Sequence, residues 1–340
     1  MVKVFIDGQA GATGLKLYQR ISGRPDLELI HIDEALRKDA GARLACIAEA
    51  DVTFLCLPDD GAVEIVSLIE KENGPDSGFS HCHVIDCSTA HRTSPDWVYG
   101  LPELARGRGA DGGNAYIGET GKRIANPGCY ATGFIMSVRP LIDAGLIAPE
   151  AMICFHALTG YSGGGKAMIE QYEAGRTDAG EGDRKRKTRA PRQYALGQQH
   201  KHLPEMRKYS GLETVPVFSP IVCDFYCGML VSVPLPRSTL RSGVPAEAVR
   251  ETLAARYAGC PLVKVREAGE EFSEAAGGGY LSADAFAGRD DIEIFVTGKD
   301  DRIEIVSRYD NLGKGASGAA IQNMNILLGL PEETGLVLGA

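Results

Sequence analysis

The chain has 340 residues, of which 44% are hydrophobic, and it carries a formal net charge of −9. That length allows two domains with a substantial core, and that apolar fraction argues against general disorder. The acidic balance argues against a general nucleic-acid-binding protein, and no apolar run reaches the ~18 residues that span a bilayer.

Strand and helix signals alternate over the first quarter of the chain. The run Met1–Gly8 reads as a first strand rather than as a signal peptide, so we expect a cytoplasmic protein. The expected strands are Val2–Ile6, Leu27–Ile32, Val52–Leu57 and Val84–Cys87, and the expected helices are Leu15–Ile21, Glu34–Ala48 and Val63–Lys71. This alternation predicts an α/β fold, a Rossmann-like doubly wound parallel sheet.

The pattern changes after residue 128. Six strands are expected with only two convincing helices between them, which favours a second α+β domain with a mostly antiparallel or mixed sheet. The expected strands are Met152–Thr159, Val215–Val222, Met229–Val233, Leu262–Val265, Ile292–Val296 and Arg302–Arg308, and the expected helices are Lys166–Glu173 and Pro245–Tyr257. A last helix, Gly315–Leu328, could return to the first domain. We therefore assign residues 1–128 and 311–340 to a dinucleotide-binding domain and residues 129–310 to a catalytic and oligomerisation domain.

The segment Gly8–Gly14 has three glycines in the spacing G-x-x-G-x-x-G, between the first strand and the first helix. Glycines in that place permit a tight turn and let a diphosphate approach the backbone at a helix N-terminus. Phosphate contacts are expected from the Thr13 side chain and from the backbone amides of the loop. The cofactor-binding residues expected here are Gly8, Gly11, Ala12, Thr13, Gly14 and Leu15.

Asp33 lies near the end of the second expected strand, where an acid normally binds a ribose hydroxyl and indicates NAD. Arg24, Arg37 and Lys38 are near enough in sequence to bind the extra phosphate of NADP instead. From the residues alone the preference between NAD and NADP stays open.

Cys129 stands where a turn containing Pro127 and Gly128 gives way to apolar residues at helical spacing. A thiol at the start of a helix lies beside unpaired N–H groups and the positive end of the helix dipole. Both favour the thiolate, which is the nucleophilic form. The other cysteines near apolar segments are interpreted as small core residues; they are Cys46, Cys56, Cys87, Cys154, Cys223 and Cys260.

A cysteine enzyme needs a proton shuttle, and His200 and His202 form the only close histidine pair in a turn-like setting. If that segment is extended, both rings lie on one side of it, and either could move the proton. A metal site is disfavoured because no third ligand has a believable spacing. The segments Asp86–Arg92 and Tyr161–Lys166 are further candidates for substrate contacts, and Arg92 could clamp a carboxylate or phosphate.

Six segments spread over nearly the whole chain resemble those of the N-acetyl-gamma-glutamyl-phosphate reductases, the arginine-pathway branch of the semialdehyde dehydrogenase family, in its shorter variant. They are Gly8–Gly14, Asp86–Arg92, Asn126–Gly133, Thr159–Lys166, His200–Glu205 and Asp310–Gly318.

The resemblance implies that Cys129 is the nucleophile and His200 the acid/base, with Asn311 and Gly315 seating the nicotinamide end of the cofactor. It implies a substrate pocket lined by Ser88, Arg92, Tyr161, His202 and Glu205. It also implies NADP(H), with Asp33 turned aside and Arg24 or Arg37 meeting the phosphate. A small acyl-phosphate substrate and a homo-oligomer, dimer or tetramer, complete these expectations.

Three alternatives remain at this stage. One is a related acyl-phosphate reductase, such as aspartate-semialdehyde dehydrogenase or a lysine-pathway analogue. Another is a cysteine–histidine hydrolase, which the glycine-rich loop disfavours. The third is a non-catalytic dinucleotide sensor, against which the presence of both Cys129 and His200 counts.

Overall fold

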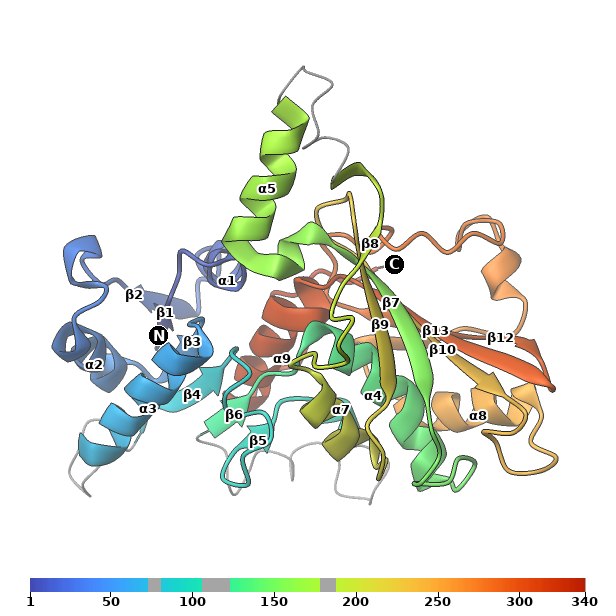
Figure 1. The fold of residues 1–340 in the computed structure, drawn as a ribbon. Coiled ribbons are helices and arrows are strands. Elements are labelled where there is room, and N and C mark those ends of the chain that lie inside the picture. The colour runs from blue at the N-terminus through green and yellow to red at the C-terminus, as the bar shows by residue number, and fades with distance from the viewer. Residues whose placement is uncertain (73–80, 106–122, 178–187, 340) are drawn as a thin grey trace. The chain divides into compact units, whose positions relative to one another are not determined.

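The computed structural model describes residues 1–72, 81–105, 123–177 and 188–339. They form two compact units (Figure 1). The first contains Met1–Ala105, the described part of Asp111–Pro127, and Ala316–Leu336, and the second contains Gly128–Gly315 and residues 337–339. None of the helices in the described ranges is long and apolar enough to cross a membrane.

The first unit is built on a six-stranded sheet in the order β2-β1-β3-β4-β6-β5, and among the described residues all its neighbouring strands are parallel. The strands are β1 (Val2–Asp7), β2 (Leu27–Ile30), β3 (Val52–Leu55), β4 (His83–Asp86), β5 (Val98–Tyr99) and β6 (Arg123–Ala125). The chain runs outward from β1 to β2 and then returns to β3 on the other side of β1. The carboxyl ends of β1 and β3 therefore flank the position where such sheets bind ligands.

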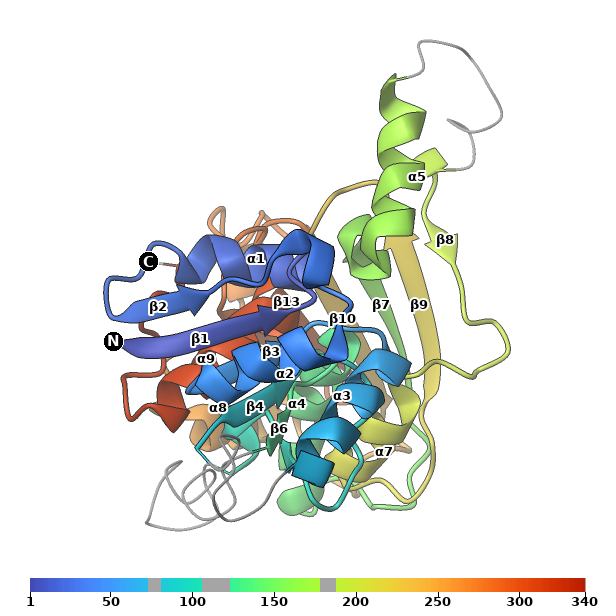
Figure 2. The same cartoon turned by 90° about the vertical axis from the view of Figure 1, so that its left-hand side faces the viewer.

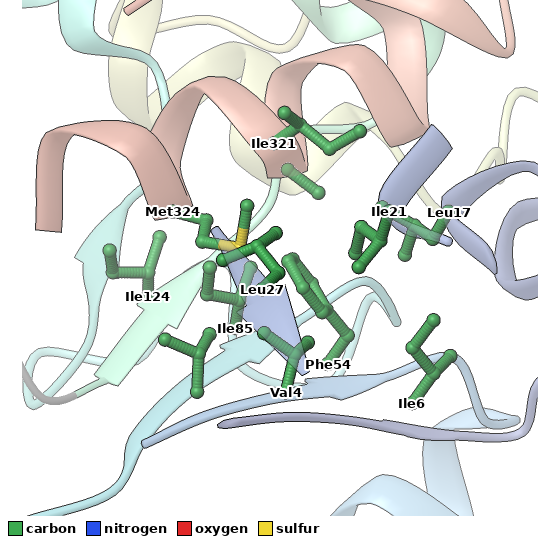
Figure 3. Packing of buried hydrophobic residues seen from close by; sticks show 12 residues of the cluster. Val4, Ile6, Leu17, Ile21, Leu27, Phe54, Ile85, Ile124, Ile321 and Met324 are labelled. Atoms are coloured by element: carbon green, nitrogen blue, oxygen red, sulfur yellow. The ribbon is translucent and has the colours of Figure 1, made fainter. Parts of the chain in front are cut away.

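Helices cover both faces of this sheet, which confirms the doubly wound prediction (Figure 2). The helices are α1 (Ala12–Ile21), α2 (Ala40–Glu49), α3 (Asp59–Glu72) and α9 (Gly318–Leu327). On one face Leu17 of α1 and Met324 of α9 pack on Val4 and Phe54 of the strands (Figure 3). On the other face Ile47 of α2 and three residues of α3 join a second cluster. The last helix of the chain thus completes the core of the first unit.

The helix expected at 34–48 is two helices, which corrects that prediction. A single 3-10 turn, η1 (Glu34–Leu36), precedes α2. Asp33 accepts from the Ala35 N–H (2.9 Å), and Asp39 accepts from the Ala42 N–H (2.8 Å). Aspartates bind free N–H groups at helix starts well, so each of them begins a new element.

The second unit contains a seven-stranded sheet in the order β11-β12-β13-β10-β7-β9-β8. Its strands are β7 (Cys154–Gly160), β8 (Arg192–Gln193), β9 (Val217–Cys223), β10 (Met229–Pro236), β11 (Val263–Val265), β12 (Ile292–Lys299) and β13 (Arg302–Tyr309). β7 pairs in parallel with β9, and β11 with β12, while the other pairs are antiparallel. The prediction of a mixed sheet is therefore confirmed.

The helix α4 (Cys129–Asp143) is the central helix of this unit and packs against β10 and β13. Two helices flank it, α7 (Leu203–Ser210) and α8 (Ala246–Tyr257). Eleven of its fifteen residues are buried, and a helix buried on nearly all sides needs an almost wholly apolar sequence. A further helix, α5 (Gly165–Thr177), projects beyond the ends of β7 and β9 (Figures 1 and 2).

A buried ion pair lies at the carboxyl end of β1, directly before the glycine-rich loop. Arg43 of α2 donates through Nε and Nη2 to both carboxylate oxygens of Asp7, at 2.7–3.2 Å. Burial raises the pKa of Asp7 above its ordinary value, although Arg43 acts in the opposite direction.

We predict that Arg43→Met lowers the free energy of unfolding by about 3–5 kcal/mol, because it leaves Asp7 buried without its partner. The double variant Asp7→Asn, Arg43→Met should recover most of that loss. An acid whose folded pKa is raised costs stability as pH rises through its titration range. The single variant should therefore be less impaired in mildly acidic than in neutral buffer. Urea unfolding measures both effects, and equal losses in the single and double variants would contradict the prediction.

Candidate active site

In the first unit, the glycine-rich loop is shaped by close backbone approaches. Gly8 has φ +88°, and a side chain there would come within 2.3 Å of the Cys56 carbonyl oxygen. At Gly14 a side chain would meet the Gly8 carbonyl oxygen at 2.6 Å. Only glycine fits both positions, so the loop folds tightly over the end of β3.

The loop ends at Gly11, which precedes α1 and makes no side-chain cap. The N–H groups of Ala12, Thr13 and Gly14 are thus at a helix start without a side-chain cap, while the Leu15 N–H donates to the Gly11 carbonyl oxygen (2.8 Å). Uncapped N–H groups, a helix dipole and glycines that leave room for the ligand fit the diphosphate of a dinucleotide. Leu15 itself is an exposed side chain.

At the end of β2, Asp33 uses its carboxylate to cap η1, and Arg37 extends from the same turn with a side chain that is 53% exposed. Arg24, by contrast, is buried. It binds the Asp26 carboxylate, the Asn325 side chain (2.7 Å) and the Thr334 carbonyl (3.2 Å). This overturns the expectation that Arg24 meets a phosphate and leaves Arg37 as the candidate.

The segment after β4 is organised by a fully buried carboxylate, Asp86. Its oxygens accept from the Ser88 backbone N–H and hydroxyl (both 2.8 Å), and His91 Nδ1 lies 2.6 Å away. The His91 ring also stacks on Trp97 at 4.2 Å. Arg92 is buried, and its Nε donates to the Asn126 carbonyl oxygen (2.9 Å). The side chains of Ser88 and Arg92 thus bind neighbouring parts of the protein. The contact between Asp86 and His91 was not predicted from the sequence, although the two residues are only five positions apart.

In the second unit, Cys129 is the first residue of α4 and is half-buried. Its carbonyl oxygen accepts from the Tyr309 hydroxyl (2.6 Å), which in turn accepts from the Gly133 N–H (3.0 Å). A side chain on Gly315 would come within 2.9 Å of the Cys129 Cβ. Tyr309 and Gly315 therefore hold the first turn of α4 in a fixed place.

The residue before α4, Gly128, provides a second point at which the start of this helix is held. Gly128 makes no side-chain cap of its own, and its N–H donates to Glu205 Oε2 (3.1 Å). Glu205 is 1% exposed and comes from α7. Sequence reasoning assigned Glu205 to the substrate pocket, and the structure shows it bound to the helix that carries Cys129.

His200 belongs to a hydrogen-bonded chain. The His202 N–H donates to His200 Nδ1 (3.1 Å), so the ring proton of neutral His200 resides on Nε2. That nitrogen lies 3.4 Å from the Tyr194 hydroxyl, which donates to the Tyr130 hydroxyl (2.9 Å). Tyr130 follows Cys129 in the sequence, and burial, with the charges of Tyr194 and Cys129, raises its pKa well above the ordinary value.

The extended geometry expected for the histidine pair is wrong. His202 is the residue before α7 and has helical backbone angles, because Pro204 at the first turn favours a helix start. Its side chain is 5% exposed, whereas that of His200 is only partly buried. The two rings lie 4.7 Å apart and nearly perpendicular, and both contact Tyr130.

Tyr161 and Asn311 are also embedded in the second unit. Tyr161 is fully buried, hydrogen-bonds to Glu173 of α5 and stacks on Tyr172 at 4.6 Å. The Asn311 amide accepts from the Gly228 N–H (2.8 Å) and donates to the Ser162 hydroxyl (3.0 Å). Asn311 thus fixes the turn that follows β7.

The sequence also has a basic run at residues 184–189, which reads as a solvated loop or as a loop near an anionic substrate, and residues 184–187 of this run lie outside the described residues. Within the described ranges, no group of three or more His, Cys, Asp or Glu side chains is arranged to hold a metal ion.

Comparison with known proteins places this geometry in a family. The dimerisation-domain model of the semialdehyde dehydrogenases matches residues 129–311, and their NAD binding domain model matches residues 35–110. The N-acetyl-gamma-glutamyl-phosphate reductase 2 of Nostoc is 43% identical over 98% of this chain and 99% of its own. The corresponding reductase of Brucella ovis is 42% identical over 96% and 99%. The chain belongs to the semialdehyde dehydrogenase family, among the N-acetyl-gamma-glutamyl-phosphate reductases.

Solved structures agree on the fold. The aspartate semialdehyde dehydrogenase of Francisella tularensis matches with a TM-score of 0.70 at 15% identity, covering 96% of this chain and all of that one (100%). The Candida albicans enzyme, solved with NADP, matches with a TM-score of 0.58 at 16% identity, covering 96% and 99%. At such identities the likeness concerns the fold alone.

We predict that Gly315→Ala slows alkylation of Cys129 by iodoacetamide and lowers turnover by about tenfold or more, because the added methyl group displaces the Cys129 side chain. Gly23→Ala is the matched control, since nothing lies within 4 Å of a side chain there. Alkylation rates followed by mass spectrometry measure the effect. Equal alkylation rates in the two variants would show that Gly315 does not confine the thiol.

Proposed function

We propose that the protein reduces N-acetyl-gamma-glutamyl phosphate to N-acetylglutamate semialdehyde and phosphate, with NADPH as reductant, in arginine biosynthesis. The observation that carries the proposal is Cys129 at the start of a buried helix, in a chain 43% identical over nearly its whole length to reductases named for this substrate. The residues of the first unit that fit a dinucleotide support the same reaction.

Cys129 acts as the nucleophile in this proposal. Its thiolate attacks the acyl carbon, the acyl–phosphate bond breaks, phosphate leaves, and a thioester remains on the sulfur. Bound NADPH would supply the hydride that reduces this thioester. The helix start that favours the thiolate also stabilises negative charge on oxygen as the carbonyl is attacked.

His200 is the proton donor. Its Nδ1 accepts a hydrogen bond from the His202 backbone, so the transferable proton is on Nε2. It donates this proton to the oxyanion formed by reduction and takes it back as the carbonyl group re-forms; the C–S bond breaks in that step, and the aldehyde and the Cys129 thiolate are released. Tyr194 and Tyr130 hold the ring, and their hydrogen bonds align its Nε2 atom. His202 and Glu205 act through position: His202 is buried beside Tyr130 at the start of α7, and Glu205 accepts from the Gly128 N–H.

The cofactor would bind at the loop Gly8–Gly14, with the Ala12 and Thr13 amides on the diphosphate. Arg37 would meet the 2′-phosphate, since Asp33 is committed to its own turn. Asn311 and Gly315 would support the nicotinamide end by fixing the turns beside Cys129. Ser88, Arg92 and Tyr161 would shape the substrate pocket in the same indirect way.

The chain would work as a homo-oligomer, dimer or tetramer, because more than half of it matches a dimerisation domain. We place it in the cytoplasm, where a reducing environment keeps a nucleophilic cysteine in its thiol form. None of the nine cysteines forms a disulfide bond with another in the structure.

We predict that Cys129→Ser lowers kcat by roughly a thousandfold or more, because the alkoxide needed for attack is far less accessible than a thiolate. Binding of NADPH, measured by fluorescence titration, should be retained. Cys154→Ser is the control, since Cys154 is exposed at the start of β7. Near-normal turnover by Cys129→Ser would refute the covalent scheme.

We predict that His200→Asn lowers kcat by about a hundredfold or more and removes the limb of the pH–rate profile that belongs to this acid. His202→Asn should instead act mainly on stability, because His202 is buried beside Tyr130. Rates across a pH series separate the two. A loss of the same limb in both variants would assign the proton to the pair rather than to His200.

We predict a strong preference for NADPH over NADH, and an increase of about tenfold in the KM for NADPH in Arg37→Ala, because one charge-assisted contact to the 2′-phosphate is lost. The KM for NADH should stay unchanged. Arg302→Ala serves as control, as its side chain is 68% exposed on the second unit.

Comparison of N-acetyl-gamma-glutamyl phosphate with β-aspartyl phosphate tests the substrate, and faster turnover of the aspartyl compound would overturn the assignment.

A further inference from the structure

Two cysteines occupy matching positions at the ends of neighbouring strands in the first unit. In the β3–β4 ladder Leu55 pairs with Asp86, so the next positions, Cys56 and Cys87, are opposite each other. The Cys87 N–H donates to the Leu55 carbonyl (2.9 Å), which continues the ladder to this point. Both side chains pack against the cluster formed by α1, α9 and the strands, so they are on the same face of the sheet.

The two thiols interact. A hydrogen bond with the side chain of Cys87 raises the pKa of Cys56, and burial and the nearby carboxylates of Asp86 and Asp7 act in the same direction. Both cysteines are half-buried rather than sealed in the core. The sequence predicts Cys56 and Cys87 to be ordinary core residues, and that role does not account for a hydrogen bond between their side chains.

Opposite positions on neighbouring strands have about the spacing that a slightly strained disulfide requires. Adjacent strands lie about 4.8 Å apart, within the range of about 4.4–6.8 Å between the Cα atoms of a disulfide. The Cβ atoms of a disulfide are closer, about 3.5–4.5 Å, so the strand ends would have to twist slightly. The loops beyond them are already joined, because the Thr89 N–H donates to Asp59 (2.8 Å). Strained disulfides have higher reduction potentials and are readily reversed.

The position of the pair ties it to the glycine-rich loop. The Cys56 carbonyl oxygen is the atom that a side chain on Gly8 would meet at 2.3 Å, so the backbone of Cys56 supports the loop directly. β1 and β3 are the strands between which the chain reverses its direction along the sheet. A shift of Cys56 therefore moves the backbone that would hold a diphosphate.

We propose that Cys56 and Cys87 form a reversible disulfide on exposure to a peroxide, and that this bond weakens dinucleotide binding. Cys87 attacks an oxygen of hydrogen peroxide as the thiolate, because the raised pKa of Cys56 disfavours the thiolate of that residue; the O–O bond breaks, one water leaves, and a sulfenic acid forms. The other thiol then attacks that sulfur, the S–S bond forms, and a second water leaves. Two electrons pass from the two thiols to the peroxide. The effect on binding rests on the proposed function, but the formation of the bond does not.

The test uses the full chain with Cys129→Ser, which removes the nucleophile that peroxide would attack first. The protein is treated with hydrogen peroxide, the remaining thiols are alkylated, and cross-linked peptides are identified by mass spectrometry. NADPH affinity is measured before treatment, after it, and after dithiothreitol, and each variant is compared with its own reduced form.

The expected result is a Cys56–Cys87 cross-link together with a loss of NADPH affinity of about tenfold, the equivalent of one charge-assisted hydrogen bond to phosphate. Dithiothreitol should restore both. Cys87→Ser should show neither change. Cys46→Ser is the matched control, because Cys46 is a half-buried cysteine of the same unit that packs on the opposite face of the sheet, and it should respond like the parent.

The proposal is overturned if the two cysteines are alkylated or oxidised singly, if either is linked to a different cysteine, or if the cross-link forms without loss of affinity. Failure of the proposed function would be seen separately, as a lack of NADPH binding by the reduced protein. In that case the cross-linked peptide alone would still decide whether the pair is a modification site.

Discussion

The position of the first turn of α4 is the constraint on which the proposed chemistry depends. Three contacts from distant parts of the chain meet there: Glu205 on the Gly128 N–H, Tyr309 on the Cys129 carbonyl, and Gly315 against the Cys129 side chain. A reactive thiolate gains from a helix start only if it stays there, and a displacement of about 1 Å can cost a hundredfold in rate. The buried helix behind Cys129 provides the rigid base that these contacts complete.

The first unit is organised around a second fixed backbone, the loop between β1 and α1. Gly8 packs directly on the Cys56 carbonyl group and Gly14 on the Gly8 carbonyl group, so the loop lies tightly against the end of β3. Asp7 and Arg43 anchor the strand before it. The same tight packing explains why a small change at Cys56 would reach the loop. A site that needs an accurately placed backbone is also one that a single covalent bond can disturb.

The polar residues of the motifs that suggested a substrate site bind one another and the nearby backbone. Ser88 and His91 bind Asp86, Arg92 binds the backbone of Asn126, and Asn311 joins two turns. Residue types that suit catalysis, such as arginine and glutamate, also suit the fixation of backbone near a reactive group. The residue types in these segments predicted that the segments lie near the reactive group. They did not predict whether each side chain contacts a ligand or another part of the protein.

The sequence by itself determined the fold class, most of the strands and the glycine-rich loop, because hydrophobic periodicity and glycine spacing are local signals. The family followed from the resemblance of six short segments to those of known reductases. It could not determine that residues 34–48 form two helices, since two aspartate caps outweigh a continuous apolar pattern. Nor could it reveal α7 at the histidine pair, the network from His200 to Tyr130, or the approach of Cys56 to Cys87. The contacts of Tyr194 with Tyr130 and of Cys56 with Cys87 join residues far apart along the chain, and only the packing of strands and helices brings such residues within bonding distance.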